Sequence, residues 1–198
     1  MMRELIVASR NKGKVAEIKE LLGRLPFKVS SLLDYPKLPD IIEDGATYKA
    51  NALKKAMQIA GLTGKITMAD DSGIEVRALG NAPGIYSARF AGMAASEKAK
   101  NRKLFEMLKG VPMPKRQARY RCVIALADAK GREIGIVQGT CGGYITTQER
   151  GTNGFGFDPL FLVKRYNKTF GELPPSVKAK ISHRARALKK FRALLDRL

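Results

Sequence analysis

The chain contains 198 residues, of which 44% are hydrophobic, so it has enough apolar side chains for one domain with its own core. Its 37 Lys and Arg residues against 18 Asp and Glu give a formal net charge of +19, which indicates an anionic partner or simply a strongly solvated surface. No segment approaches the ~20 consecutive apolar residues that a membrane span requires, and two cysteines are too few for a secreted disulfide scaffold. We therefore expect one cytoplasmic domain over residues 1–198, without a membrane partner.

The first half of the chain alternates apolar runs with helical patterns. Residues 5–8 predict a strand, which is followed by a helix that ends at Gly23. A second helix is expected to begin at Thr47, a good N-cap residue, and to end before Gly61. Residues 66–69 then predict a short, buried strand.

The second half predicts more strand. Ser96 is expected to cap a helix, and residues 117–128 and 133–147 flank a Lys-Gly turn that predicts a long antiparallel hairpin. A strand is expected at residues 160–163, and the chain ends in a basic amphipathic helix whose apolar face contains Leu188, Phe191, Leu194, Leu195 and Leu198. These patterns predict an α/β fold with a mixed β-sheet, flanking helices and two lobes of one domain around a central cleft.

A polar turn at residues 9–14 lies where the first predicted strand is followed by the first helix. Free backbone N–H groups and the helix dipole attract anions at such a turn. Ser9 and Asn11 can donate to phosphate oxygens, and Lys14 supplies a positive charge. The same residue types are also ordinary helix-capping and surface residues, and their spacing is not that of a P-loop.

Two adjacent carboxylates, Asp70 and Asp71, follow the short strand predicted at residues 66–69. At the carboxyl end of a strand in an α/β sheet they would lie where ligands commonly bind. A divalent cation would allow both to remain ionised, and carboxylate oxygens are suitable ligands for Mg²⁺. Glu43, which precedes the second helix, could join them. The alternative is an Asx turn in which the aspartates only cap backbone N–H groups.

An aromatic loop is a third candidate. Residues 154–159 place Phe155 and Phe157 between glycines, where a flat base could stack on Phe155 and Asp158 could accept hydrogen bonds from ring N–H groups. The alternative is two core phenylalanines beside a turn.

The start of the last helix is a fourth candidate. His183, the only histidine of the chain, and Arg184 follow Lys178 and Lys180. Together they form a donor-rich cluster that suits carbonyl or phosphate oxygens, although single histidines are more often structural.

Six short motifs occur in order along the chain. They are Ser9-x-Asn11-x-x-Lys14, Asn51-Ala52-x-x-Lys55-Ala56, Ala69-Asp70-Asp71-Ser72-Gly73, Pro83-Gly84-Ile85-Tyr86-Ser87-Ala88-Arg89, Gly154-Phe155-Gly156-Phe157-Asp158-Pro159 and Ile181-Ser182-His183-Arg184. Together, and nearly from end to end, they resemble the inosine triphosphate pyrophosphatase family. The resemblance implies an elongated subunit, a homodimer, and Mg²⁺-dependent hydrolysis of ITP, dITP or XTP to the monophosphate and pyrophosphate.

The resemblance also implies a role for each matching residue. Asp71 would be the general base, and Glu43 and Asp70 would hold Mg²⁺. The triphosphate would be bound by Ser9, Asn11, Lys14 and Lys55. The base would be bound by Ser72, Phe155, Gly156, Phe157, Asp158, Lys178, His183 and Arg184, with the last two donating to the 6-oxo group that adenine lacks.

One position departs from the family pattern. Ala50 stands where relatives commonly carry Glu, so the capping box is lost and Thr47 is expected to cap the second helix alone. The expected cost is about 1 kcal/mol or less. If the missing acid also supports the metal, Glu43 has the larger share in binding it.

Two other functions fit parts of the sequence. Basic stretches at residues 98–121 and 178–197 would suit a nucleic-acid-binding protein without turnover, whereas an enzyme should bind nucleic acid only weakly and nonspecifically. A nucleotide-binding regulator is the other alternative, but it would gain nothing from a base aimed at water. The enzyme hypothesis requires the paired aspartates and the aromatic loop to line one nucleotide-sized crevice.

Overall fold

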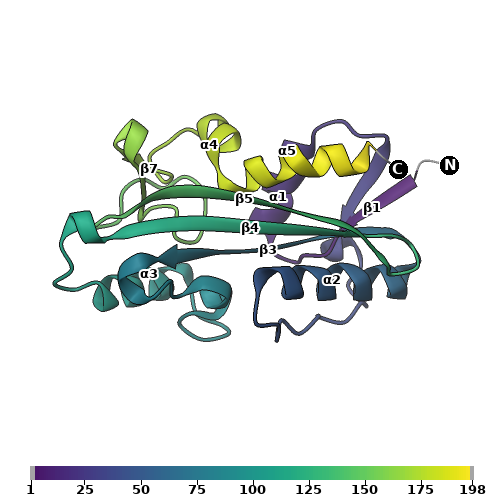
Figure 1. Cartoon of the computed structure of the whole chain (residues 1–198), viewed down its shortest axis with the longest axis horizontal. Helices are drawn as coiled ribbons and strands as arrows, with labels where there is room; N and C mark the ends of the chain where they lie inside the picture. Colours follow the sequence, from purple (N-terminus) through teal and green to yellow (C-terminus); the bar gives the residue numbers. More distant parts are fainter. Residues whose placement is uncertain (1–2, 197–198) are drawn as a thin grey trace. The chain divides into compact units, whose positions relative to one another are not determined.

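A computed structural model describes residues 3–196 of the chain (Figure 1). Seven strands form one sheet in the order β2-β1-β3-β4-β5-β6-β7. Strand β1 pairs in parallel with β2 and β3, whereas β6 is antiparallel to β5 and β7, so the predicted α/β class with a mixed sheet is confirmed.

The elements have the following bounds. The strands are β1 (Arg3–Val7), β2 (Phe27–Ser31), β3 (Ile66–Val76), β4 (Gln117–Ala127), β5 (Glu133–Ile145), β6 (Phe161–Val163) and β7 (Lys168–Thr169). The helices are α1 (Lys12–Leu22), α2 (Tyr48–Thr63), α3 (Glu97–Met107), α4 (Pro175–Ile181) and α5 (His183–Leu195). Among residues 3–196, none of these helices combines the length and the apolar character that crossing a bilayer demands.

The helix starts expected from the sequence are confirmed. Thr47 Oγ1 accepts the backbone N–H of Ala50 at 3.1 Å, so this threonine does cap α2. Ser96 Oγ accepts the N–H of Ala99 at 3.2 Å at the start of α3. Local hydrogen bonds of this kind depend on residues three apart, which is why the sequence shows them.

Of the two helix ends predicted from the sequence, one is confirmed and one is wrong. Gly23 ends α1 as expected, but the expectation that α2 ends before Gly61 is wrong, because α2 continues to Thr63 and ends at Gly64. Gly64 has φ of 64°, in the left-handed region that glycine adopts without strain, whereas Gly61 lies within the helix. Leu198, expected on the apolar face of the last helix, lies outside the described residues.

The described chain forms two compact units. The first contains residues 3–71, 122–139 and 184–196, and the second contains residues 72–121 and 140–183. Strands β3, β4 and β5 each continue from one unit into the other.

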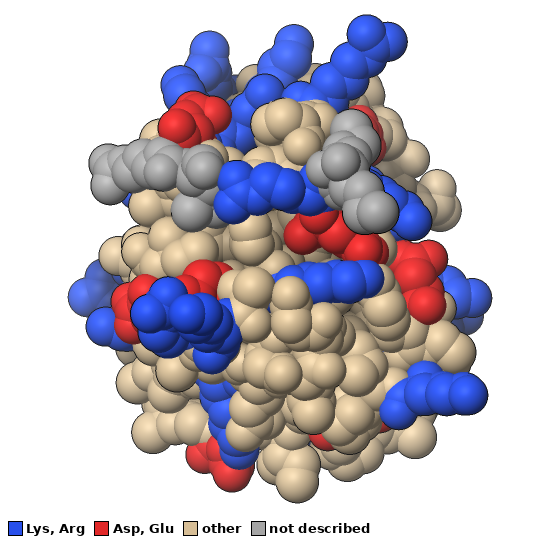
Figure 2. Space-filling view, turned by 90° about the vertical axis from the view of Figure 1, so that its right-hand side faces the viewer, with Lys and Arg blue, Asp and Glu red and all other residues tan. Residues whose placement is uncertain are grey.

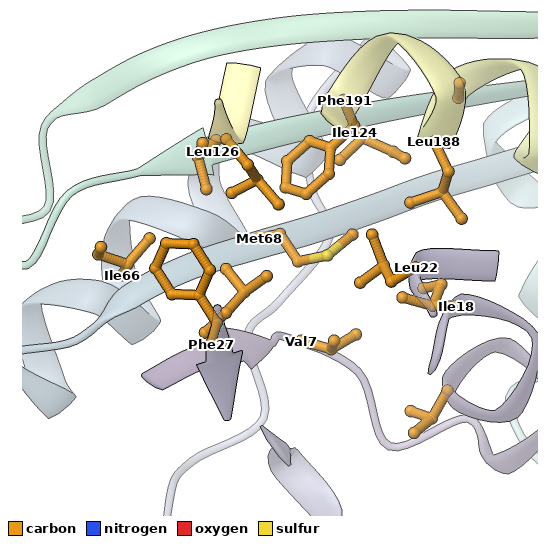
Figure 3. Close-up of a cluster of buried hydrophobic side chains, with 14 of the residues drawn as sticks. Val7, Ile18, Leu22, Phe27, Ile66, Met68, Ile124, Leu126, Leu188 and Phe191 are labelled. Atoms are coloured by element: carbon orange, nitrogen blue, oxygen red, sulfur yellow. The ribbon is translucent and has the colours of Figure 1, made fainter. Parts of the chain in front are cut away.

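The core of the first unit lies between the sheet and helices α1 and α5 (Figure 3). Helix α1 contributes Val15, Ile18 and Leu22 at helical spacing, and α5 contributes Leu188 and Phe191. Helix α2 covers the opposite face of the same strands (Figure 1). Burial of these side chains fixes the first turns of α1 and α5 next to β3.

The second unit has a separate core that is rich in aromatic rings. Phe161 and Phe170 stack with their centroids 5.2 Å apart, and Tyr120 lies 4.6 Å from Phe161. Leu104 and Leu108, at the end of α3, are fully buried in the same core. This packing supports the loop that carries residues 154–159.

Strand β3 differs most from the sequence-based prediction. It runs for 11 residues, so Asp70 and Asp71 lie within it. The prediction that they follow a short strand is therefore wrong, and so is the alternative of an Asx turn. Successive side chains of a strand point to opposite faces, so the two carboxylates lie on different sides of the sheet. The polar run Asp-Asp-Ser-Gly is typical of a turn. It can be buried in a strand because cations from other elements lie beside it, and the local sequence does not show them.

A partly buried carboxylate in β1, Glu4, makes stability depend on pH. Glu4 accepts hydrogen bonds from Ser30 Oγ at 2.5 Å, Tyr35 Oη at 2.7 Å and Lys65 Nζ at 2.6 Å. Burial alone would raise the pKa of Glu4, but these hydrogen bonds outweigh it and lower the pKa from 4.5 to about 2. Stability from ionised Glu4 is present above pH 4.5 and is lost as the pH falls through about 2.

We therefore expect Glu4→Gln to lower the free energy of unfolding at pH 7 by about 1–3 kcal/mol, because charged and polar partners are left unsatisfied. The difference from wild type should shrink as the pH falls from about 5 to about 2. Urea denaturation at a series of pH values measures it. A difference that stays constant over this range would show that ionisation of Glu4 does not contribute.

Candidate active site

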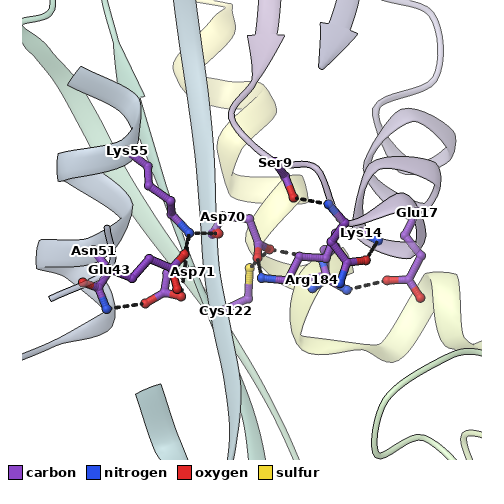
Figure 4. A network of polar contacts seen from close by, with 11 residues as sticks. Ser9, Lys14, Glu17, Glu43, Asn51, Lys55, Asp70, Asp71, Cys122 and Arg184 are labelled. Carbon is purple, nitrogen blue, oxygen red and sulfur yellow. Dashed lines mark hydrogen bonds and ion pairs between the residues drawn. The ribbon is translucent and has the colours of Figure 1, made fainter. Parts of the chain in front are cut away.

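Charged and polar side chains from six segments of the first unit meet around the middle of β3 (Figure 4). They come from the β1–α1 loop and α1, from the loop before α2, from α2 itself, from β3, from β4 and from the first turn of α5. The residues are Ser9, Lys14, Glu17, Glu43, Asn51, Lys55, Asp70, Asp71, Cys122 and Arg184.

On one side of β3, Asp70 is held by two cations and a thiol. Its carboxylate lies 2.8 Å from Lys14 Nζ and 3.1 Å from Arg184 Nε, and Cys122 Sγ donates to it at 2.9 Å. Burial would raise the pKa of Asp70, but the charges of Arg184 and Lys14 outweigh it and hold the pKa well below its usual range. Asp70 is therefore an ionised carboxylate although it is only 1% exposed.

Arg184 is itself deeply buried and joins two carboxylates. Besides Asp70, its guanidinium contacts Glu17 of α1 at 2.5 Å. Burial would lower the pKa of Arg184, but Asp70 and the other acidic groups around it raise the pKa above its usual value. Arg184 thus connects the first turn of α5 to α1 and β3 through ion pairs. The base-reading role that the sequence implied for it stays a prediction.

On the other side of β3, Asp71 faces α2. Asn51 Nδ2 donates to its carboxylate at 3.2 Å, and Lys55 Nζ lies 3.9 Å from it. Lys55 also forms a very short ion pair with Glu43 and donates to the Asp70 carbonyl at 2.9 Å. Burial raises the pKa of Asp71, and the Lys55 charge offsets this only in part. A carboxylate with raised proton affinity in a polar site is suited to accept a proton.

The carboxylates around β3 are candidate ligands for Mg²⁺. Within residues 3–196, no three His, Cys, Asp or Glu side chains are arranged to hold a metal ion on their own. Mg²⁺ commonly retains several waters and uses one or two protein carboxylates together with substrate phosphates, so a full protein cage is not needed. Glu43 and Asp71 both contact Lys55 and so lie on the same side of β3, whereas the Asp70 carboxylate lies on the other. The oxygen atoms of these carboxylates are ligands that suit a hard cation such as Mg²⁺.

The β1–α1 loop is shaped by its own polar side chains. Asn11 is the N-cap of α1 and accepts the N–H of Lys14 at 3.0 Å, while Ser9 Oγ accepts the N–H of Asn11 at 3.2 Å. Arg10 ties the loop to the segment before α2, because its guanidinium donates to the Leu32 carbonyl at 2.6 Å and to Asp40 at 2.8 Å. The loop is thus held in place, with the positive end of the α1 dipole and Lys14 on one side.

The second unit holds most of the residues predicted to bind the base. Asp158 is 2% exposed and accepts the Phe155 N–H at 2.9 Å and Lys178 Nζ at 2.5 Å. Its carboxylate therefore fixes the 154–159 loop from within. Lys178 Nζ lies 4.8 Å from the centre of the Phe155 ring, a cation–π distance.

The two phenylalanines of this loop differ. Phe157 is a core residue that packs edge-on against Phe90 with the ring centroids 6.3 Å apart. Phe155 and Gly156 are partly exposed, so Phe155 is the ring that could accept a flat base. His183 is 4% exposed and stacks on Tyr120 at 4.5 Å, and Ser72 is partly exposed next to Asp71.

Sequence reasoning assigned no role to Asn51, Glu17, Cys122 and Tyr120. Asn51 lies one helical turn before Lys55, and this spacing indicates that both face the same side of α2, toward Asp71. Glu17 lies three residues after Lys14, but nothing local pairs it with Arg184, which is 167 residues away. Cys122 and Tyr120 become neighbours of Asp70 and His183 only through the fold. The expectation that both clusters line one crevice stays a prediction.

Gly154 provides a test of the aromatic loop. It has φ of 77°, and a Cβ there would overlap the Asp158 carboxylate, whereas Gly156 has φ of 63° with open space around it. If the loop binds a base, as the resemblance implies, Gly154→Ala should weaken nucleotide binding at least tenfold, because Asp158 must shift and release Phe155. Gly156→Ala is the matched control and should cost only its backbone strain, about 1 kcal/mol of stability. Isothermal titration with ITP and urea denaturation measure both effects, and equal behaviour of the two variants would contradict the supporting role of Asp158.

The fold and this carboxylate–lysine–arginine site define an α/β protein in which buried charges are clustered around a central strand. The chain belongs to the Ham1 family, whose model matches residues 5–194, and this confirms the resemblance stated from the six motifs. A dITP/XTP pyrophosphatase of Desulforamulus reducens is 49% identical over 98% of this chain and 96% of its own. Another, of Bacillus licheniformis, is 50% identical over 98% and 99%. The structure of a HAM1 protein from Coxiella burnetii covers both chains completely at 39% identity, with a TM-score of 0.89.

Proposed function

We propose that the chain hydrolyses inosine and xanthosine (deoxy)nucleoside triphosphates to the monophosphate and pyrophosphate, and so removes deaminated purines from the nucleotide pool. Relatives named dITP/XTP pyrophosphatases match it at about half of all positions over nearly their whole length, which supports the assignment. The observation that carries it is the group on the α2 side of β3. There a buried carboxylate with a raised pKa, Asp71, lies beside Lys55 and Glu43.

The proposed reaction uses water as the nucleophile. Asp71 accepts a proton from the water as its oxygen bonds to the α-phosphorus, and the bond from that phosphorus to the bridging oxygen of pyrophosphate breaks. Ser9, Asn11, Lys14 and Lys55 bind the triphosphate. Charge stabilisation and positioning account for most of the catalysis of such a displacement.

Glu43 is the residue that we propose to hold Mg²⁺ on the α2 side of β3, because it reaches Lys55 beside the proposed base, Asp71. When bound, Mg²⁺ would neutralise charge on the phosphate oxygens. Asp70 is the second proposed ligand, and its carboxylate contacts Lys14 and Arg184 on the other side of β3. We expect Glu43→Gln to raise the Mg²⁺ concentration for half-maximal activity at least tenfold. The same titration with Asp44→Asn, an exposed neighbour paired with Lys54, should be unchanged.

The base would lie on Phe155, with His183 and Arg184 donating to its 6-oxo group. Adenine would then present an amino group to a donor and leave polar groups unpaired, which is the stronger form of discrimination. Asp158 would act through the position of Phe155 and Lys178. We also propose that the enzyme works as a homodimer in the cytoplasm, which light scattering on a sizing column and fractionation would test.

One assay tests the proposal. The protein is incubated with Mg²⁺ and ITP, dITP, XTP, ATP or GTP in turn, and pyrophosphate and monophosphate are measured. We expect turnover of the first three and little of ATP and GTP. Inactivity with all of the first three would refute the proposed function, and binding of ITP without turnover would favour a regulator instead.

A further inference from the structure

The catalytic cluster does not account for the high positive charge of the chain. Its three cations, Lys14, Lys55 and Arg184, contact carboxylates of the same cluster. The site is therefore nearly balanced in charge, whereas the whole chain has a formal charge of +19. The excess must lie elsewhere.

Helix α5 separates its residues into an apolar face and a basic face. Its inner side buries Ala187, Leu188, Phe191 and Leu195 in the core of the first unit. Its outer side exposes Arg186, Lys189, Lys190 and Arg192, and the helix sequence from His183 to Leu195 contains no acidic residue. Lys and Arg side chains project from the upper part of the face shown in Figure 2, the level at which Figure 1 places α5.

The other basic helix does not have this character. Helix α3 contains Glu97 and Glu106 among its cations. Both helices have a lysine that donates to a backbone carbonyl, Lys103 to Phe90 at 2.6 Å in α3 and Lys190 to Gln138 at 2.9 Å in α5, so the difference lies in the acidic residues. Of these two helices, α5 is the one whose exposed charges are all of one sign.

We propose that the outer face of α5 binds the phosphate backbone of double-helical nucleic acid without sequence preference. Side chains at i, i+3 and i+4 lie about 5–6 Å apart on a helix, so Arg186, Lys189 and Lys190 form one continuous cationic surface. This outer face presents no aromatic ring for stacking on unpaired bases and no Asn or Gln for reading base edges.

An anionic membrane is the less suitable partner. A helix that binds a bilayer surface inserts its apolar face between the lipids, but the apolar face of α5 is already buried in the core. The phosphates of a rigid duplex can bind the exposed cations of α5 without insertion of an apolar face. With three or four phosphates neutralised, log K should fall against log salt with a slope of about −3.

The test compares two triple variants with the same change in net charge. Arg186→Gln/Lys189→Gln/Lys190→Gln alters α5, and Lys98→Gln/Arg102→Gln/Lys109→Gln alters exposed positions on and just after α3. Binding of the full chain to two labelled 20-base-pair DNA duplexes of unrelated sequence is measured by fluorescence anisotropy from about 50 to 200 mM NaCl. We expect wild type to bind both duplexes with equal affinity. The α5 variant should lose at least tenfold in affinity for DNA at low salt, and its slope of log K against log salt should be nearer zero by about 2–3. The α3 variant should stay within about threefold of wild type.

Three results would overturn the proposal: equal losses in both variants, binding that is insensitive to salt, or binding to phosphatidylserine vesicles but not to DNA. The melting temperature of each variant checks its fold. Should the triple variant unfold, Lys189→Gln alone must reduce the slope by about 1. None of these substitutions touches the catalytic cluster, so ITP hydrolysis is read independently of DNA binding.

Discussion

Asp71→Asn should lower kcat for ITP by about 10²–10⁴-fold, because asparagine retains the shape of the side chain but cannot accept the proton from water. The carboxylate is 4% exposed and its pKa is raised by burial, so it can take a proton that an exposed aspartate would not. The amide can still face Asn51, so the fold should be preserved. Steady-state kinetics at saturating Mg²⁺, with circular dichroism as the check of folding, measures this effect.

Asp44→Asn is the matched control for this variant. Asp44 lies next to Glu43, is exposed, and contacts Lys54 at 2.7 Å, so its loss should alter kcat by less than about twofold. Turnover of Asp71→Asn within a few-fold of wild type would remove Asp71 from the role of general base.

Arg184→Ala should lower the free energy of unfolding by about 3–5 kcal/mol, because it leaves the buried Asp70 carboxylate without one of its two cations. Lys14 alone would then compensate Asp70, and Glu17 would lose its partner. Arg184→Lys should recover only part of the loss, since one ammonium group cannot replace a guanidinium that bridges two carboxylates. Urea denaturation gives these values.

Lys189→Ala is the control, because Lys189 is exposed on the same helix, and its loss should change stability by less than about 0.5 kcal/mol. A loss below about 1 kcal/mol for Arg184→Ala would contradict the structural role of this ion pair. The preference of the same variant for ITP over ATP tests the other prediction for Arg184. An unchanged preference would show that Arg184 does not read the base.

The ion pairs of Lys14 and Lys55 also bear on how a triphosphate would bind. Lys14 and Lys55 contact Asp70 and Glu43, so both carboxylates have a cation partner before substrate arrives. A bound triphosphate would compete for the same ammonium groups. The lysines are thus oriented toward the site in advance, which reduces the ordering that binding requires.

The sequence by itself determined the local elements and the family. Caps such as Thr47 and Ser96 act over three residues, and the β4–β5 hairpin follows from two strand-forming runs on both sides of a short Lys-Gly turn. The six motifs were sufficient to identify the family, because they name residue types at fixed spacings. Phe155 as the partly exposed ring was also among the sequence-based candidates.

Only the tertiary structure decided the length of β3 and the separate environments of its two aspartates. A run of two acids, Ser and Gly is compatible with a turn until Lys14, Lys55 and Arg184 are placed around it. These cations come from three different helices, and Arg184 bonds to Asp70 across 114 residues of sequence. Burial of a charge is stable only when an opposite charge is close, and that condition depends on distances in space that the order of residues does not contain.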